Sequence, residues 1–178
     1  CPASHYLCGG IKVDENARTT INHLYAAGEC TRTGLHGGNR LASNSLLEAI
    51  VYADAAAKHS LPLIDNINWC DEIPEWNDEG TTLNEEMVLI TQSEKEVNQI
   101  MQAYVGIVRS NLRLKRAFDR LELIYKETES LFQRSVVSKE ICELRNIVNT
   151  AYLVIKSAMQ RKESRGLHYT IDYPKKNE

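Results

Sequence analysis

The segment TGLHGGNRLASNSLLEAI, residues 33–50, places glycines and polar side chains directly before an apolar run. The run and the residues after it favour a helix over residues 45–59. A helix N-terminus presents unsatisfied backbone N–H groups and the positive end of the helix dipole, so anions bind there readily. Arg40 adds a planar guanidinium that suits a carboxylate or a phosphate. With the Ser-Asn-Ser of residues 43–45, the segment forms a candidate ligand site.

The neighbouring residues extend this candidate site. Gly34, Gly37 and Gly38 allow the backbone to approach a flat or bulky ligand closely. Glu29, at the end of a preceding apolar stretch, can accept hydrogen bonds from sugar-type hydroxyls. A ligand with both hydroxyls and an electron-poor ring would fit this set. The same residue types are equally typical of an ordinary turn followed by a helix cap, so the residues alone leave both interpretations open.

Other chemistries have weaker support in the sequence. The pairs His5-x2-Cys8 and Cys30-x5-His36 could supply four zinc ligands, but their spacings match no usual zinc pair. Neither a Gly-x-Gly-x-x-Gly fingerprint nor a P-loop lysine motif occurs. The five cysteines are odd in number and scattered, which indicates free thiols in a reducing cytoplasm.

Composition limits the class of protein. The chain has 178 residues, is 43% hydrophobic and 25% charged, and carries a formal charge of −3. These values are ordinary for a globular protein and give no footprint for nucleic acid or an anionic membrane. No apolar run approaches the roughly 20 residues needed to span a bilayer. Residues 1–82 hold only 5 of the 21 basic residues but 11 of the 24 acidic ones, so we expect two differently built halves.

The first half predicts a small β portion and one helix. Residues 9–20 are typical of a hairpin, and residues 23–29 of a short buried strand. In the helix that follows, Ser45 and Glu48 have the spacing of a capping box. Residues 1–60 supply too few strands for a sheet of their own, and the chain does not begin with Met. We therefore expect this half to be the last part of a longer domain.

The second half predicts a helical bundle joined by a connector. Residues 61–82 contain six acidic residues and no basic one, and we expect Trp69 and Trp76 to pin this connector to a surface. Over residues 83–165 apolar residues recur at helical spacing, with breaks near 109–111 and 135–138, which predicts a three-helix bundle. We expect Gly166 to stop the last helix, and residues 166–178 to form a tail. The predicted fold class is mainly α with a small β portion.

Three stretches resemble one known family. HYLCGGIKVD, LYAAGECTRTGLHGGNRLASNSLLEAIVY and RKESRGLHYTIDYP closely resemble the L-aspartate oxidases, which belong to the succinate dehydrogenase and fumarate reductase flavoprotein superfamily. The resemblance is strong over residues 5–52 and 161–174 and extends in pattern through the bundle. It implies that residues 1–60 are the C-terminal part of a FAD-binding α/β domain with a short piece of its capping region. The tail is then expected to dock on that domain through a salt-bridged helix end.

The resemblance also implies roles for individual residues. The dicarboxylate substrate is expected at His5, Arg40 and Ser43, with His36 a weaker candidate. FAD is expected at Glu29, Asn44, Ser45 and Leu46. The family's catalytic arginine and pyrophosphate-binding glycine motif are expected upstream of this chain. We therefore expect the isolated chain to be inactive and to hold FAD weakly.

The implied activity is oxidation of L-aspartate to iminoaspartate in NAD biosynthesis, with reoxidation by oxygen or fumarate. It implies a cytoplasmic enzyme, neither nucleic acid nor membrane as partner, and contact with the next enzyme of quinolinate synthesis. The resemblance does not fix an oligomeric state. Two alternatives stay open: a fragment of a fumarate reductase or succinate dehydrogenase flavoprotein, and a noncatalytic helical interaction module.

Overall fold

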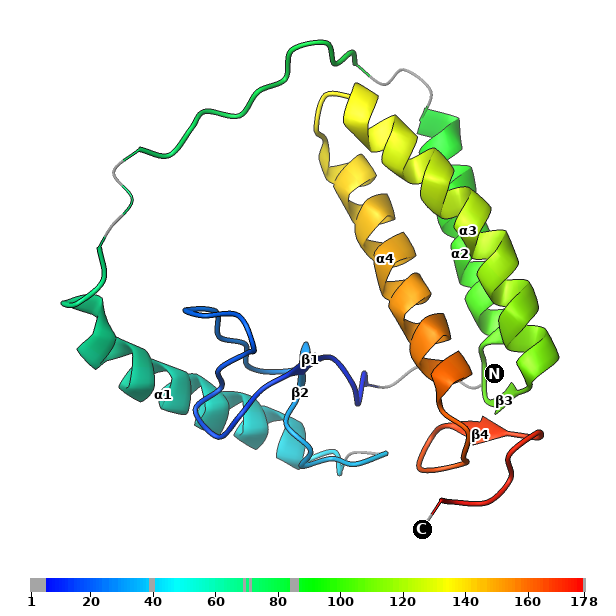
Figure 1. Cartoon of the computed structure of the whole chain (residues 1–178), viewed down its shortest axis with the longest axis horizontal. Helices are drawn as coiled ribbons and strands as arrows, with labels where there is room; N and C mark the ends of the chain where they lie inside the picture. Colours follow the sequence, from blue (N-terminus) through cyan, green and yellow to red (C-terminus); the bar gives the residue numbers. More distant parts are fainter. Residues whose placement is uncertain (1–5, 39–40, 69, 71, 84–86, 178) are drawn as a thin grey trace. The chain divides into compact units, whose positions relative to one another are not determined.

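The computed structural model describes residues 6–38, 41–68, 70, 72–83 and 87–177. The chain divides into two compact units, Cys1–Pro74 and Glu75–Glu178. Each unit has its own character: the first holds one helix and two short strands, and the second holds three helices and two short strands among the described residues (Figure 1). The predicted fold class, mainly α with a small β portion, is confirmed.

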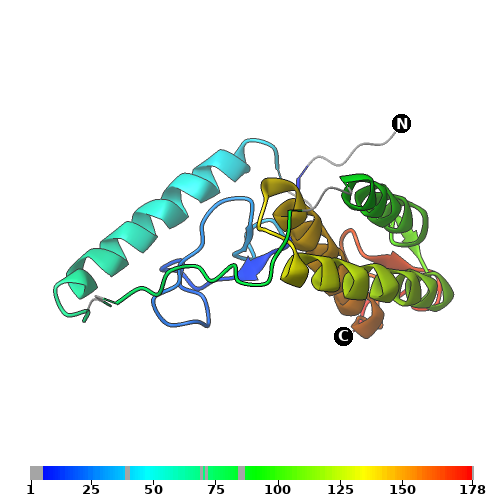
Figure 2. The same cartoon turned by 90° about the horizontal axis from the view of Figure 1, so that it is seen from above.

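The second unit is a three-helix bundle. It consists of α2 (Met87–Tyr104), α3 (Asn111–Arg134) and α4 (Lys139–Gln160), which lie side by side in both views (Figures 1 and 2). Serine side chains cap the last two helices at the predicted breaks. Ser110 Oγ accepts a hydrogen bond from Arg113 N at 3.2 Å, and Ser138 Oγ accepts one from Ile141 N at 3.5 Å. Each cap satisfies one amide that the first helical turn leaves without a partner.

One apolar cluster fills the centre of this bundle. Leu121 and Ile155 have no exposed surface, and Val148 has 1%. Side chains at spacings of three and four along each helix meet there, as the sequence pattern predicts. The largest fully buried side chains are Leu114, Leu121, Ile141, Ile155, Val97, Val148 and Thr128. All the buried members of this core cluster lie in the second unit, so the bundle carries its own core.

The C-terminal tail packs back onto the bundle and does not extend α4. Strand β3 (Val108–Arg109) pairs in parallel with β4 (Tyr169–Thr170). The expectation that Gly166 stops the last helix is wrong, because α4 already ends at Gln160. Gly166 has a φ of +60° and lies in the turn that joins Arg165 to His168 by two backbone hydrogen bonds.

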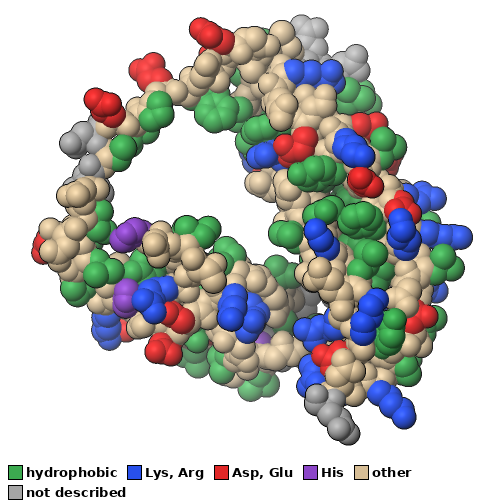
Figure 3. Space-filling model, viewed as in Figure 1, with side chains coloured by type: hydrophobic (Ala, Val, Ile, Leu, Met, Phe, Trp, Pro, Cys, Tyr) green, Lys and Arg blue, Asp and Glu red, His purple; other side chains and the backbone are tan. Residues whose placement is uncertain are grey.

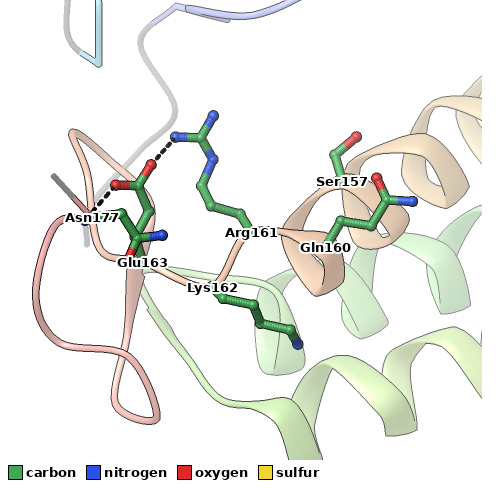
Figure 4. Close-up of a pocket in the computed structure, with 6 residues that line it drawn as sticks. All are labelled: Ser157, Gln160, Arg161, Lys162, Glu163 and Asn177. Atoms are coloured by element: carbon green, nitrogen blue, oxygen red, sulfur yellow. Dashed lines mark hydrogen bonds and ion pairs between the residues drawn. The ribbon is translucent and has the colours of Figure 1, made fainter.

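Ion pairs close the tail at the end of α4. The carboxylate of Glu163 accepts hydrogen bonds from the guanidinium group of Arg161 and from Asn177 N (Figure 4). It also accepts hydrogen bonds from the guanidinium group of Arg165. All of these residues except Arg165 line a shallow polar pocket, which is formed by Ser157, Gln160, Arg161, Lys162, Glu163 and Asn177. The carboxylate of Glu163 and the guanidinium of Arg161 already pair with each other. We therefore interpret this pocket as a structural contact that fixes the tail, not as a ligand site.

In the first unit the β elements differ from the prediction in their pairing. Strand β1 (Ile11–Lys12) pairs in parallel with β2 (Thr31–Arg32), so the hairpin predicted over residues 9–20 is wrong. The antiparallel contact forms later, at the bridge between Arg18 and Tyr25. The predicted strand over residues 23–29 contributes only that bridge. Strands of two residues are too short for an alternating pattern to reveal.

Helix α1 (Asn44–Ile64) is longer than predicted and is capped differently. It continues through Pro62 into the predicted connector. The predicted capping box is wrong, because Ser45 Oγ donates to Ala42 O and the Glu48 side chain is used elsewhere. Of the two tryptophans, Trp69 lies outside the described residues. Trp76 is 70% exposed, so it does not pin the connector.

Candidate functional site

The candidate site is a strand, a turn and a helix that pack against each other within the first unit. Tyr25 Oη and His59 Nδ1 are 2.7 Å apart, near the C-terminal half of α1. A Cβ atom at Gly28 would lie 3.8 Å from the Cβ of Ala49. Residues 25–33 therefore run along α1 toward its N-terminus, and the glycine-rich turn leads back into that same helix end.

A buried carboxylate joins the turn to the helix. Glu48 is 3% exposed and is the one residue of α1 classed as buried. One of its oxygens accepts a hydrogen bond from Thr33 Oγ1, and the other lies 2.5 Å from His36 Nε2. Because a carboxylate can only accept, this contact places the ring hydrogen of His36 on Nε2. Sequence reasoning missed this cluster, although an acidic residue amid leucines and isoleucine was the available signal.

The expected cofactor ligand Glu29 presents its carboxylate at the surface beside this helix. Glu29 is exposed, and its Oε1 accepts a hydrogen bond from Leu7 N at 3.0 Å. Its other oxygen accepts no hydrogen bond from the described residues. The preceding residue, Gly28, lies close to Ala49 in the second turn of α1, so the Glu29 backbone is near the helix start. This position suits hydroxyl groups of a ligand that lies across the helix end.

The N-terminus of α1 carries the other expected ligands. Ser43 is the N-cap residue, is exposed, and its side chain makes no capping hydrogen bond. Asn44 and Ser45 form the first turn with Leu46, which is 68% exposed. Gly34 and Gly37, in the turn before, have positive φ angles and open space where a Cβ would lie. The backbone is thus accessible where a ligand would approach.

The structure does not place every predicted residue. His5 and Arg40 lie outside the described residues, so their expected contact with a dicarboxylate stays a prediction. His36 is described, and its Nε2 is committed to Glu48, which argues against that nitrogen contacting a ligand. Among the described residues, no group of three or more His, Cys, Asp or Glu side chains is arranged to hold a metal ion. None of the helices described is long and apolar enough to cross a bilayer.

The outer surface of α1 reverses the usual burial pattern. Its apolar side chains are exposed while its glutamate is buried: Leu46, Leu47, Ile50 and Val51 are 57–68% exposed. Apolar side chains are visible on the face of this unit that Figure 3 draws, beside charged and histidine side chains. Exposed apolar patches of this kind mark contact surfaces.

A second polar cluster, half-buried, lies in the bundle unit. Arg109 donates to Val105 O at 3.0 Å, and its Nη1 lies 2.9 Å from His168 Nδ1. Burial lowers the pKa of Arg109 and, together with the cations Arg109 and Arg161, lowers the pKa of His168. Neutral His168 accepts through Nδ1, so its Nε2 carries the hydrogen. That buried atom has no hydrogen-bond partner among the described residues. The cluster anchors the tail to the junction of α2 and α3.

Comparisons with known proteins fit both halves of the chain. The family described as FAD binding domain matches residues 1–46, and the family described as fumarate reductase flavoprotein C-term matches residues 94–178. An L-aspartate oxidase of Pseudomonas aeruginosa is 48% identical over 97% of this chain, and one of Vibrio cholerae is 44% identical over the same share. The chain belongs to the succinate dehydrogenase and fumarate reductase flavoprotein superfamily.

Solved structures of this superfamily share the fold. A quinol-fumarate reductase with menaquinol molecules superimposes on this chain with a TM-score of 0.78 at 27% identity. The superposition covers 98% of this chain and 33% of the reductase chain. Mycobacterium smegmatis Sdh1, in complex with UQ1, gives 0.74 at 26% identity, with 98% and 31% covered. The chain spans about a third (32%) of the length of the curated relatives that it matches.

Proposed function

We propose that this chain supplies the C-terminal flavin- and substrate-facing portion of a FAD-dependent L-aspartate oxidase. The observation that carries the proposal is the identity of 44–48% to curated L-aspartate oxidases over 97% of the chain. The geometry supports it, because the expected FAD ligands Glu29, Asn44, Ser45 and Leu46 all lie on the packed strand, turn and helix of the first unit.

The residues present fit part of a flavin nucleotide. The exposed carboxylate of Glu29 has acceptor capacity for ribityl hydroxyls. The N-terminus of the 21-residue helix α1 would stabilise negative charge on a reduced ring. Leu46 offers an apolar surface beside that end. The bound flavin would supply the redox chemistry, by accepting a hydride from the substrate.

The proposed contacts to the substrate come from residues of this chain. Arg40 would hold one carboxylate of L-aspartate in a bidentate hydrogen bond, and His5 and Ser43 would add donors. Together they would fix the direction of the substrate Cα–H bond, which is a contribution of positioning. The product would be iminoaspartate, a reactive imine. We further propose that the next enzyme of quinolinate synthesis receives this product in the cytoplasm. A reducing cytoplasm suits the free thiols of Cys8, Cys30, Cys70 and Cys142.

A chimera tests this proposal directly. The matched part of this chain replaces the corresponding segment, 173 residues long, of the Pseudomonas aeruginosa L-aspartate oxidase, and flavin absorbance is followed without oxygen. We expect bound FAD and bleaching of its absorbance by L-aspartate. A chimera that binds FAD but is bleached by succinate and not by L-aspartate would contradict the proposal.

A second titration concerns the chain alone. One helix end and one carboxylate cover little of a dinucleotide, so we expect the 178-residue chain to bind FAD weakly or not at all. Tight stoichiometric binding would show that the turn, Glu29 and α1 form a working flavin site without further segments, and that this expectation is wrong.

The second candidate function is that of a fumarate reductase or succinate dehydrogenase flavoprotein. The fold similarity to the quinol-fumarate reductase favours it, with a TM-score of 0.78. Its sequence identity of 27% is lower than the 44–48% shared with L-aspartate oxidases, so we rank it second. The comparison of L-aspartate with succinate in the chimera separates the two.

A further inference from the structure

Glu48 is the buried centre of a contact network that joins three segments. It belongs to α1, and it accepts hydrogen bonds from Thr33 and His36 of the glycine-rich turn. The His36 ring in turn packs edge-on against Tyr6, with ring centroids 5.7 Å apart. The network therefore reaches from the helix, through the turn, to the N-terminal segment.

The two charged or titratable side chains of this network, Glu48 and His36, are buried inside the first unit. The side chain of Glu48 is 2% exposed, and that of His36 is 8% exposed. A buried carboxylate is costly unless hydrogen bonds satisfy it, and here both of its oxygens have a donor. Removing one donor would leave a buried lone pair without a partner, so the three side chains depend on one another.

We propose that Glu48 is a positioning residue that fixes the substrate side of the site relative to the flavin side. This inference rests on the proposed function. Three of the four proposed flavin contacts, Asn44, Ser45 and Leu46, lie on α1 itself and stay in place as long as the helix forms. The fourth, Glu29, follows Gly28, which lies close to Ala49 of the same helix.

The turn leads in sequence to Arg40, and Tyr6 directly follows His5, the residues proposed to contact the substrate. The turn and the segment at Tyr6 are attached to the helix through Glu48, so losing its carboxylate displaces them selectively.

The principal test is Glu48→Gln in the chimera with the Pseudomonas aeruginosa enzyme. Glutamine keeps the size of the side chain but replaces one of the two accepting oxygens by an NH2 group, which then faces the hydrogen of either Thr33 Oγ1 or His36 Nε2. Calorimetry measures binding of succinate, used as a dicarboxylate without the amino group, and a separate titration measures FAD. We expect the Kd for succinate to rise about 10- to 100-fold, with little change in FAD affinity.

The matched control is Asp54→Asn on the same helix. Asp54 is exposed and pairs with Lys58 four residues on, so its substitution also removes a carboxylate from α1 but leaves the network intact. We expect both affinities to stay as in the parent. Substitution of His36 adds a rescue test: His36→Gln keeps a donor near the position of Nε2 and should bind succinate more tightly than His36→Leu.

The outcomes separate the inference from the function on which it rests. If the parent chimera fails to bind FAD or succinate, the proposed function fails. If the parent binds both and Glu48→Gln leaves succinate affinity unchanged, the positioning role alone is overturned. Equal losses of FAD affinity, succinate affinity and thermal stability would also overturn it, since Glu48 would then act on the unit as a whole.

Amide hydrogen exchange of the 178-residue chain gives a measurement that does not depend on the chimera. We expect Glu48→Gln to speed exchange in residues 33–38, and Asp54→Asn to leave it unchanged. Unchanged exchange in the glutamine variant would mean that Glu48 does not hold the turn, which would overturn the proposal.

Discussion

Replacing Leu121 by alanine should destabilise the bundle strongly, whereas the same change two residues further along α3 should not. Leu121 has no exposed surface, and Leu123 is 61% exposed. At about 0.8 kcal/mol per buried methylene-sized group, the three carbon atoms lost at Leu121 cost about 2.5 kcal/mol. The cavity left behind adds to this, so we expect a loss of about 3 kcal/mol in the free energy of unfolding.

Urea unfolding of the 178-residue chain, followed by far-ultraviolet circular dichroism, measures this difference. With a denaturant slope of about 1.5 kcal/mol per molar, the midpoint should fall by about 2 M in Leu121→Ala. In Leu123→Ala the free energy should change by about 0.5 kcal/mol or less, because surface substitutions have small effects. Equal losses in the two variants, or a loss below about 1 kcal/mol at Leu121, would refute the assignment of this core.

Three further predictions follow from the polar contacts and the strand pairing. The pKa of His168 is lowered in the folded chain by burial and nearby cations, so the unfolded chain binds more protons once the pH falls below about 6.5. Acidification through this range should therefore weaken the bundle. Urea titrations at several pH values measure this dependence, and His168→Asn should remove it. Arg145 binds Glu129 through two hydrogen bonds of 2.6 and 3.1 Å, and Arg145→Lys should cost about 1 kcal/mol in chemical denaturation, because lysine cannot form the paired contact. A Cβ at Gly10 would overlap Cys30 O, and the φ of Gly10 is +138°. Gly10→Ala should therefore separate β1 from β2 and speed amide exchange at the two strands, and an unchanged exchange pattern would contradict the close approach.

The bundle could be predicted from sequence because its information is local. Leu114 and Leu121, one heptad apart, and Ile141 and Val148 on the next helix, all occupy the buried face that their spacing predicts. The breaks between helices were also readable. Each is marked by a serine, Ser110 or Ser138, whose side chain caps the helix that follows.

The first unit was predicted less well because its contacts are not local. β1 pairs with a strand twenty residues later, and neither strand is long enough to show alternation. The spacing of Ser45 and Glu48 fits a capping box, but burial against the turn decides where the carboxylate goes. His36 could be singled out as polar and near the site, yet only the fold shows that its Nε2 faces Glu48 and not a ligand.

The pairing of β3 with β4 has a consequence for the order in which the bundle assembles. Arg109 and its partner Thr170 are separated by all of α3 and α4, and Asn111 N binds the Asp172 carboxylate at 2.6 Å. A ribosome produces the junction of α2 and α3 long before the residues that cover it. The helices can associate while synthesis continues, but the Arg109 side chain acquires its histidine neighbour only after the tail has emerged. Closure of this end of the bundle is therefore a late event of synthesis, and a stalled or prematurely terminated chain would leave that arginine uncovered for proteases and chaperones to detect.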